Sequence, residues 1–237
     1  MSMIIDGVDF QSLPAERYWQ WPSGYKKNKQ DEIYAMIMSN AYIGSRKMDG
    51  AYYRFIKDME GNMVLQGRSE SVNGGFLDKI DWVPHLHSFF DALPRGTCLL
   101  GEIYFPNNEG SRHVTTIMGC LPEKARERQE KGEKLHYYVF DVWAWNGTSL
   151  LSVTAETRFS QLGYVSEYVA RADNKFIDVA KYYYGQALWD ELMRVRMIGG
   201  EGIVITKSNS HAEPGKRTAR KTLKIKKELD NPIDCFL

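Results

Sequence analysis

The sequence has no long hydrophobic run and contains few cysteines and histidines. No apolar stretch approaches the roughly 20 residues that cross a membrane, so we expect no membrane partner. The first residues lack the basic and apolar segments of a secretory signal. Cys98, Cys120 and Cys235 are odd in number and widely separated, which predicts reduced thiols in an intracellular protein. The five histidines show no zinc-ligand spacing with them.

The composition is typical of a globular protein. Hydrophobic residues make up 43% of the 237 residues and charged residues 26%, which excludes collagen-like, disordered and coiled-coil classes. This length fits one large domain or two small ones. No repeat or low-complexity linker divides the chain, so the sequence predicts one mixed α+β domain.

The net charge of +1 conceals a basic segment. Residues 216–227 contain seven cations and no acid, so the rest of the chain carries a net charge of −6. A concentrated basic patch on an acidic body is typical of contact with phosphate or nucleic acid. The alternative is a solvated surface stretch.

Periodicity and turn residues predict the order of the elements. Residues 14–30 are rich in aromatic and polar residues and indicate an irregular, exposed start. Apolar residues at helical spacing predict helices over 31–39 and 182–198, alternating charge predicts one over 121–134, and 86–93 is expected to form another. Strand-like runs cover 51–57, 63–66, 99–105, 137–145 and 203–207, and a Gly-Asn turn makes the first two a hairpin.

The most informative segment is Ser45-Arg46-Lys47-Met48-Asp49-Gly50. Arg46 raises the local positive charge and so helps Lys47 to lose its proton, and Gly50 lets the backbone admit a ligand closely. A neutral lysine amine is a nucleophile. Alone, the tetrapeptide Lys47-Met48-Asp49-Gly50 would indicate a surface turn. Four further motifs follow in order, at 101–102, 140–141, 201–205 and 223–226.

In this order the motifs resemble those of the covalent nucleotidyltransferase superfamily, most closely the adenylation domain of compact virus- or phage-type ATP-dependent DNA ligases. The resemblance spans Lys47 to Lys226, about three quarters of the chain. It implies an ATP-grasp-like nucleotidyltransferase fold, with antiparallel sheets flanked by helices and a nucleotide cleft between them. It also implies a lysine that forms a covalent lysyl-AMP from ATP. The AMP then passes to a 5′-phosphate at a nick in duplex DNA, and the strand is sealed in replication, repair or recombination.

The resemblance assigns a role to each motif. Lys47 would be the nucleophile, and Arg46 and Met48 beside it would contact the nucleotide. Glu102 would face the ribose, and Glu201 a divalent metal or the attacking lysine. Acids that face phosphates need a cation between them, so both carboxylates would bind Mg²⁺ or another divalent metal.

The remaining roles concern the base and the α-phosphate. Phe140 would stack on adenine, because a π face suits a flat base; its alternative is a core aromatic. Lys224 and Lys226 lie two apart on a strand, project from one face and could both reach the α-phosphate.

Several positions depart from the family pattern. An arginine usually lies five residues after the nucleophile, where this chain has Tyr52; Arg54 shares the face of that strand and is expected to take its place. Arg68 resembles the second arginine of such ligases and would meet the ribose or the nick phosphate.

Three further departures affect the nucleotide site. Where the family usually has a lysine after Glu201-Gly202, this chain has Thr206. Lys207 follows one residue later and would lie on the other face of the strand unless a bulge intervenes. Thr222 replaces an aromatic, and Ser45 replaces an acid that reads the adenine amino group, which weakens the expectation of ATP over GTP.

The end of the chain resembles the start of another domain. We expect residues 1–229 to form the adenylation domain and 230–237 to begin a missing C-terminal OB domain that completes the enzyme, so the chain alone should seal nicks weakly. We expect a monomer in the cytoplasm of a host cell, of viral or prophage origin.

Other functions would use similar residues. An RNA ligase, with RNA as partner, or a capping-type guanylyltransferase would share the lysines and acids. A non-catalytic nucleotide or nucleic-acid binding module would not need a reactive lysine.

Overall fold

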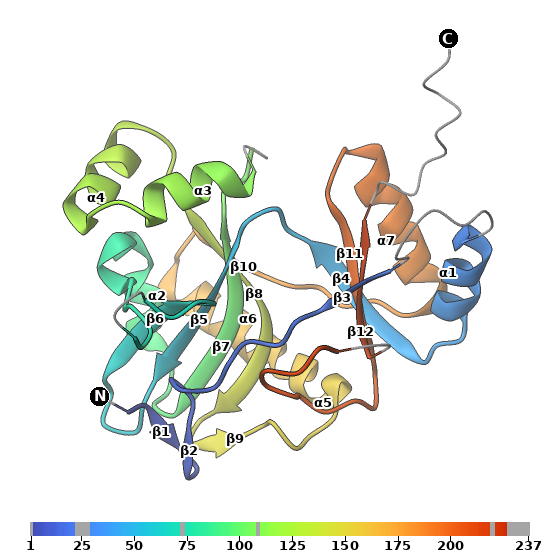
Figure 1. Cartoon of the computed structure of the whole chain (residues 1–237), viewed down its shortest axis with the longest axis horizontal. Coiled ribbons are helices and arrows are strands. Elements are labelled where there is room, and N and C mark those ends of the chain that lie inside the picture. The colour runs from blue at the N-terminus through green and yellow to red at the C-terminus, as the bar shows by residue number, and fades with distance from the viewer. Residues whose placement is uncertain (1, 22–28, 72–73, 108–109, 219–220, 227–237) are drawn as a thin grey trace.

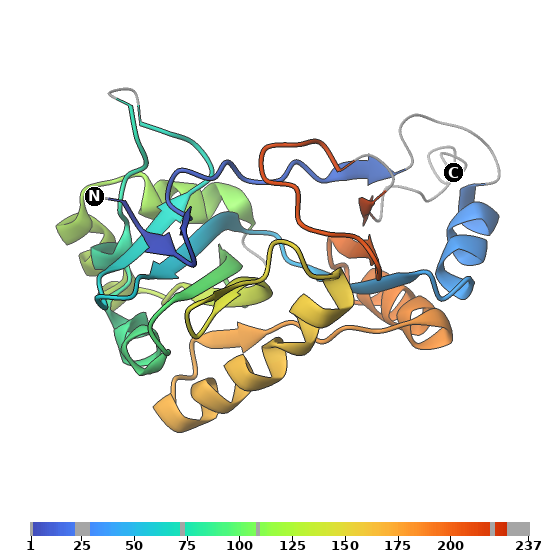
Figure 2. The same ribbon diagram turned by 90° about the horizontal axis from the view of Figure 1, so that it is seen from below.

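The structure is a computed structural model that describes residues 2–21, 29–71, 74–107, 110–218 and 221–226. It consists of a large sheet and a small sheet, each covered by helices, with the hairpin of β1 (Ile4–Ile5) and β2 (Val8–Asp9) beside the large one (Figures 1 and 2). Residues 230–237, expected to begin an OB domain, lie outside the described residues.

The large sheet has the strand order β10-β8-β7-β5-β6, and β9 also pairs with β8. Its strands are β5 (Ala51–Lys57), β6 (Met63–Gly67), β7 (Thr97–Tyr104), β8 (His136–Trp145), β9 (Thr148–Ser149) and β10 (Ile177–Val179). All pairs are antiparallel except β8 with β10. The predicted hairpin is confirmed as β5 and β6.

The small sheet has the order β3-β12-β11-β4. Its strands are β3 (Trp19–Trp21), β4 (Tyr42–Lys47), β11 (Gly202–Lys207) and β12 (Thr222–Lys226). Only the pair of β12 with β3 is parallel. The chain passes from β4 directly into β5, so the residues between these strands join the two sheets (Figure 1).

Two helices cover the small sheet and the others surround the large one (Figure 1). The core of the small sheet contains Ile33 and Ile37 from α1 (Lys29–Met38) and Leu188 and Leu192 from α7 (Gly185–Met197). Around the large sheet lie α2 (His87–Ala92), α3 (Ser111–Met118), α4 (Pro122–Lys131), α5 (Ala155–Ser160) and α6 (Leu162–Ala172), with short 3-10 turns at Ile80–Trp82 and Pro84–Leu86. None of the helices in the described ranges is long and apolar enough to span a bilayer.

The mixed α+β prediction is confirmed, and the start of the chain needs a correction. The four predicted helices are present with shifted ends, whereas α3, α5 and α6 were not predicted. Residues 14–30 are not irregular and exposed throughout, because Trp19–Trp21 pairs with β12, and Ala15 and Glu16 are buried. A parallel partner about 200 residues away leaves no local signal in this segment.

Candidate active site

A pocket lies between the two sheets and contains most of the predicted site residues. Its walls come from β5, β7 and β8 of the large sheet and from β4, β11 and β12 of the small sheet. The predicted residues in its wall are Arg46, Lys47, Met48, Arg68, Glu102, Phe140 and Lys224.

Strand register brings Lys47, Glu201 and Lys226 together. Gly202 pairs with Lys47 on one side and with Lys226 on the other, so Glu201, one residue earlier, lies between two lysines. Lys47 Nζ donates to Glu201 Oε2 at 2.5 Å and to the carbonyl oxygen of Met48 at 3.2 Å. Lys226 Nζ lies 3.2 Å from Glu201 Oε1. The Lys47 side chain is only 12% exposed, so its amine is held facing the interior.

Gly202 is required for this arrangement. Its φ is +136°, and a Cβ there would lie 2.0 Å from the carbonyl oxygen of Ile225 on β12. Any side chain would therefore push β12 away from β11, and Lys226 would move away from Glu201.

Glu102 and Lys224 form the rest of the charged half of the pocket. Burial raises the pKa of Glu102 to about 7; the ammonium of Lys47 opposes that rise and the carboxylate of Glu201 adds to it. Burial lowers the pKa of Lys224, and the nearby charges of Lys47 and Arg68 lower it further. These shifts show that the charged groups share one poorly hydrated space.

The other half of the pocket is aromatic. Tyr18, Phe140, Phe159 and Tyr182 line it, and the rings of Phe159 and Tyr182 stack with centroids 4.0 Å apart. The Tyr182 hydroxyl donates to the carbonyl oxygen of Phe140 at 2.5 Å. The pocket therefore offers flat apolar faces at one end and charged groups at the other, as a nucleotide requires.

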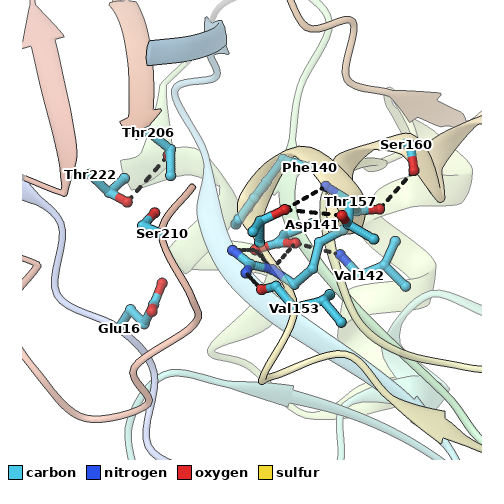
Figure 3. Close-up of polar contacts among 12 residues, drawn as sticks. Glu16, Phe140, Asp141, Val142, Val153, Thr157, Ser160, Thr206, Ser210 and Thr222 are labelled. Atoms are coloured by element: carbon cyan, nitrogen blue, oxygen red, sulfur yellow. Dashed lines mark hydrogen bonds and ion pairs between the residues drawn. The ribbon is translucent and has the colours of Figure 1, made fainter. Parts of the chain in front are cut away.

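A buried ion pair supports the aromatic half from behind. Arg158 on α5 donates from Nε to Asp141 Oδ1 at 3.1 Å and from Nη1 to the carbonyl oxygen of Val153 at 3.1 Å (Figure 3). Both charged side chains are 3% exposed. Asp141 follows Phe140 on β8, so this pair fixes the strand that presents Phe140 to the pocket.

Two predicted residues lie elsewhere. Arg54 is not in the pocket wall: its guanidinium is 5.5 Å from the ring centre of Trp143 and donates to the carbonyl oxygen of Leu13 at 2.6 Å. Tyr52 lines the pocket in its stead. Lys207 is also outside the pocket wall.

Thr206 occupies the place expected of a lysine in the pocket wall, and its hydroxyl donates to Thr222 at 3.2 Å (Figure 3). Lys226 contacts Glu201 but is not part of the wall either, so Lys224 is the member of the predicted lysine pair that faces the pocket.

The N-terminal segment contributes pocket residues that sequence reasoning missed. Glu16 and Tyr18 line the aromatic half and are placed there by the strand β3 that follows them. No motif marks them, because their proximity to Phe140 depends on long-range strand pairing.

The carboxylates fit a metal that is shared with phosphates. No cluster of three or more His, Cys, Asp or Glu side chains occurs among the residues that the structure describes. The charge of Glu201 acts on the Glu102 carboxyl group and raises its pKa. Mg²⁺ is usually bound by one or two carboxylates together with substrate phosphates, so two acids beside Lys47 suffice.

Comparison with known proteins gives a family and a fold. The sequence profile of the family described as ATP dependent DNA ligase domain matches residues 26–226. The ligase domain of Mycobacterium tuberculosis LigD is 18% identical, with a TM-score of 0.64 over 92% of this chain and 62% of that chain. Bacteriophage T7 DNA ligase, solved with ATP, is 14% identical, with a TM-score of 0.58 over 91% of this chain and 69% of that chain. A Lig E DNA ligase is 19% identical, with a TM-score of 0.58 over 90% of this chain and 68% of that chain.

The chain thus spans about two thirds of the length of these three ligases. No curated protein sequence matches it significantly. At these identities the solved structures establish the fold, and the nucleotidyltransferase architecture expected from the motifs is confirmed.

Proposed function

We propose that this chain, which belongs to the ATP dependent DNA ligase domain family, transfers AMP from ATP to its own Lys47. The carrying observation is the largely buried amine of Lys47, held 2.5 Å from Glu201 at the charged end of a pocket whose other end is aromatic.

The first chemical step uses the contact between Lys47 and Glu201. The ammonium must lose a proton before it can attack, and Glu201 Oε2 is within hydrogen-bond distance to receive it. The Nζ lone pair then forms a bond to the α-phosphorus of ATP. The bond from that phosphorus to the bridging oxygen breaks, and its electron pair leaves with pyrophosphate. The product is a phosphoramidate between Lys47 and AMP.

Residues around the amine support this step. Lys224 faces the pocket and would neutralise charge that develops on the α-phosphate. Glu102 would contact the ribose, Phe140 the base, and Arg68 the ribose or a nick phosphate. Mg²⁺ bound by Glu102 and Glu201 with the nucleotide phosphates would screen the negative charge that opposes attack.

The later steps belong to the complete ligase reaction. AMP would pass from Lys47 to a 5′-phosphate at a nick in duplex DNA, and a 3′-hydroxyl would displace it to seal the strand. The exposed Lys216 and Arg217 of the basic segment would contact the DNA backbone. A missing OB domain would complete the DNA clamp, and the chain would act as a monomer.

The test is the intact mass of the purified protein before and after incubation with Mg²⁺ and ATP or GTP. Prior treatment with pyrophosphate removes any AMP acquired during expression. The Lys47→Ala variant tests the nucleophile, and Lys207→Ala is the matched control because Lys207 lies outside the pocket wall. We expect one added AMP on the wild type and on Lys207→Ala, and none on Lys47→Ala.

Other outcomes separate the alternatives. A GMP adduct would favour a guanylyltransferase, and tight ATP binding without an adduct would favour a binding module. Incubation of the adenylated protein with nicked DNA or nicked RNA then identifies the acceptor by the loss of AMP from the protein.

A further inference from the structure

Glu16 is a buried carboxyl group in the aromatic half of the pocket. It is 7% exposed and accepts a hydrogen bond at Oε1 from the backbone N–H of Glu213 at 2.5 Å. Within the described ranges its carboxyl forms no ion pair, and Oε2 has no hydrogen-bond donor. A carboxyl group with a spare oxygen in a pocket wall is a site that a ligand donor can satisfy.

The charges around Glu16 differ from those around Lys47. Its electrostatic neighbours are Asp141, Arg158 and Glu213. Arg158 is the one cation in this group, and its Nε and Nη2 already donate to Asp141 while Nη1 donates to Val153. No dashed line reaches Glu16 in Figure 3. Glu16 is therefore available to a ligand rather than committed to the buried ion pair.

The position of Glu16 fixes which part of a nucleotide it would meet. With the α-phosphate at Lys47, the base extends towards Phe140 and Tyr182, where Glu16 also lines the wall. The edge of a purine base carries its hydrogen-bonding groups, so a carboxyl group there meets that edge.

We propose that Glu16 reads the amino group at C6 of adenine and so makes the pocket select ATP over purine nucleotides that lack this group. The proposal rests on the proposed function of the pocket as a nucleotide site. Adenine presents the C6 amino donor next to a ring nitrogen acceptor, whereas guanine presents a carbonyl oxygen at C6. The spare oxygen of Glu16 accepts from the first and meets an acceptor in the second.

The protonation state of Glu16 suits this role. Burial raises its pKa to about 7, the backbone N–H of Glu213 and the charge of Arg158 oppose the rise, and Asp141 adds to it. Above that pH the ionised carboxyl group only accepts hydrogen bonds, so its spare oxygen accepts from the C6 amino group of adenine and repels the C6 carbonyl oxygen of guanine.

Other polar groups at this end discriminate less. Ser45 and Thr206 both line the pocket, and Thr206 donates to Thr222. A hydroxyl group donates or accepts by rotation, so neither can reject a carbonyl oxygen in favour of an amino group. Glu16 is thus the acid at this end of the pocket that can read the base.

The experiment compares two nucleotides in a background that cannot react. Calorimetry on the Lys47→Ala protein measures the Kd of ATP and of purine riboside triphosphate, which lacks the C6 amino group. We expect ATP to bind about tenfold more tightly. Adding Glu16→Leu should reduce that ratio to about one, and adding Glu16→Gln should reduce it as well, because the amide oxygen stays on the Glu213 N–H and the amide nitrogen cannot accept from the C6 amino group.

The matched control is Glu213→Gln in the same background. Its side chain contacts Lys216 and Lys221, and the backbone N–H that binds Glu16 is unchanged, so the ratio should stay near tenfold. Equal binding of the two nucleotides by Lys47→Ala, absence of ATP binding, or an unchanged ratio after Glu16→Leu would each overturn the assignment. Circular dichroism establishes that the Leu variant is folded.

This design separates the inference from the proposed function. An AMP adduct on wild-type protein with a ratio insensitive to Glu16 refutes the role of Glu16 alone. A ratio that depends on Glu16 without any adduct supports the role of Glu16 and refutes the covalent step.

Discussion

Replacing Gly50 by alanine should damage both the stability and the chemistry of this protein. Gly50 lies between β4 and β5, three residues after Lys47, where the two sheets meet. A Cβ there would lie 2.3 Å from the carbonyl oxygen of Ile103 and 2.9 Å from Glu102 Cγ, both on β7. Since Cβ atoms do not approach other atoms closer than 3.0 Å, β5 or β7 must move.

The size of the effect follows from that overlap. Overpacking a close contact costs about 1–3 kcal/mol. For a chain of this length each kcal/mol lowers Tm by roughly 2–4 °C, so we expect a Tm about 2–12 °C lower. The displacement also moves Glu102 relative to Lys47, and a misplacement of about 1 Å can slow a reaction roughly 100-fold.

The same substitution at Gly163 is the matched control. Gly163 is an exposed residue of α6, and a Cβ there would have no atom within 4 Å. Alanine at such a site stabilises by about 0.4–1 kcal/mol through the entropy of the unfolded chain. For Gly163→Ala, the Tm measured by scanning calorimetry should therefore stay unchanged or rise, and the initial rate of AMP transfer should stay unchanged. A Gly50→Ala protein with wild-type Tm and rate would refute the packing argument.

Asp141→Asn should lower the free energy of unfolding, measured in urea, by roughly 3–5 kcal/mol, because it leaves Arg158 buried without its partner. Adding Arg158→Met to that variant should restore much of the lost stability. Arg54→Met should change the initial rate of AMP transfer less than about threefold, because Arg54 lies outside the pocket wall; a loss of about 100-fold would instead place Arg54 at the nucleotide. Burial raises the pKa values of Glu16 and Glu102 from 4.5 to about 7, so the folded state keeps protons that the unfolded state releases. The free energy of unfolding should therefore fall as the pH rises from about 4.5 to 7, on the order of 3 kcal/mol per group, and Glu16→Gln should flatten that dependence.

The charged half of the site was predictable because its residues lie in recognisable motifs on adjacent strands. Lys47 ends β4, Glu201 precedes β11 and Lys226 ends β12, and the register of these three strands alone aligns them. The motifs were recognised by their order along the chain, whereas the strand Tyr42–Lys47 itself was not predicted. The two-sheet architecture follows from the motif order but not from periodicity, which indicated only a mixed α+β chain.

The aromatic half was predictable only in part, because it depends on contacts that no local pattern encodes. Glu16 and Tyr18 reach the pocket through the parallel pairing of β3 with β12. Tyr52 and Arg54 do share a strand face, as predicted, but two residues along a strand span roughly 6.6 Å. That distance takes Arg54 beyond the pocket and over Trp143.

The pairing of β11 also decides which lysines can serve the α-phosphate. Its register with both neighbours runs without interruption from Gly202 to Thr206, so no bulge turns Lys207 inwards. Val204 and Thr206 face the pocket and Lys207 faces away, so under the proposed function Lys224, paired with Val204, is the lysine that would neutralise the phosphate.

Lys224→Ala should therefore slow AMP transfer by roughly 100-fold, whereas Lys207→Ala should leave the rate within about twofold of wild type. The rate is measured by intact mass at saturating ATP, so that weaker binding does not contribute. If Lys207→Ala slowed the transfer as much as Lys224→Ala does, β11 would have to rotate its faces when ATP binds, and the alternation on which this assignment depends would be wrong for the reacting state.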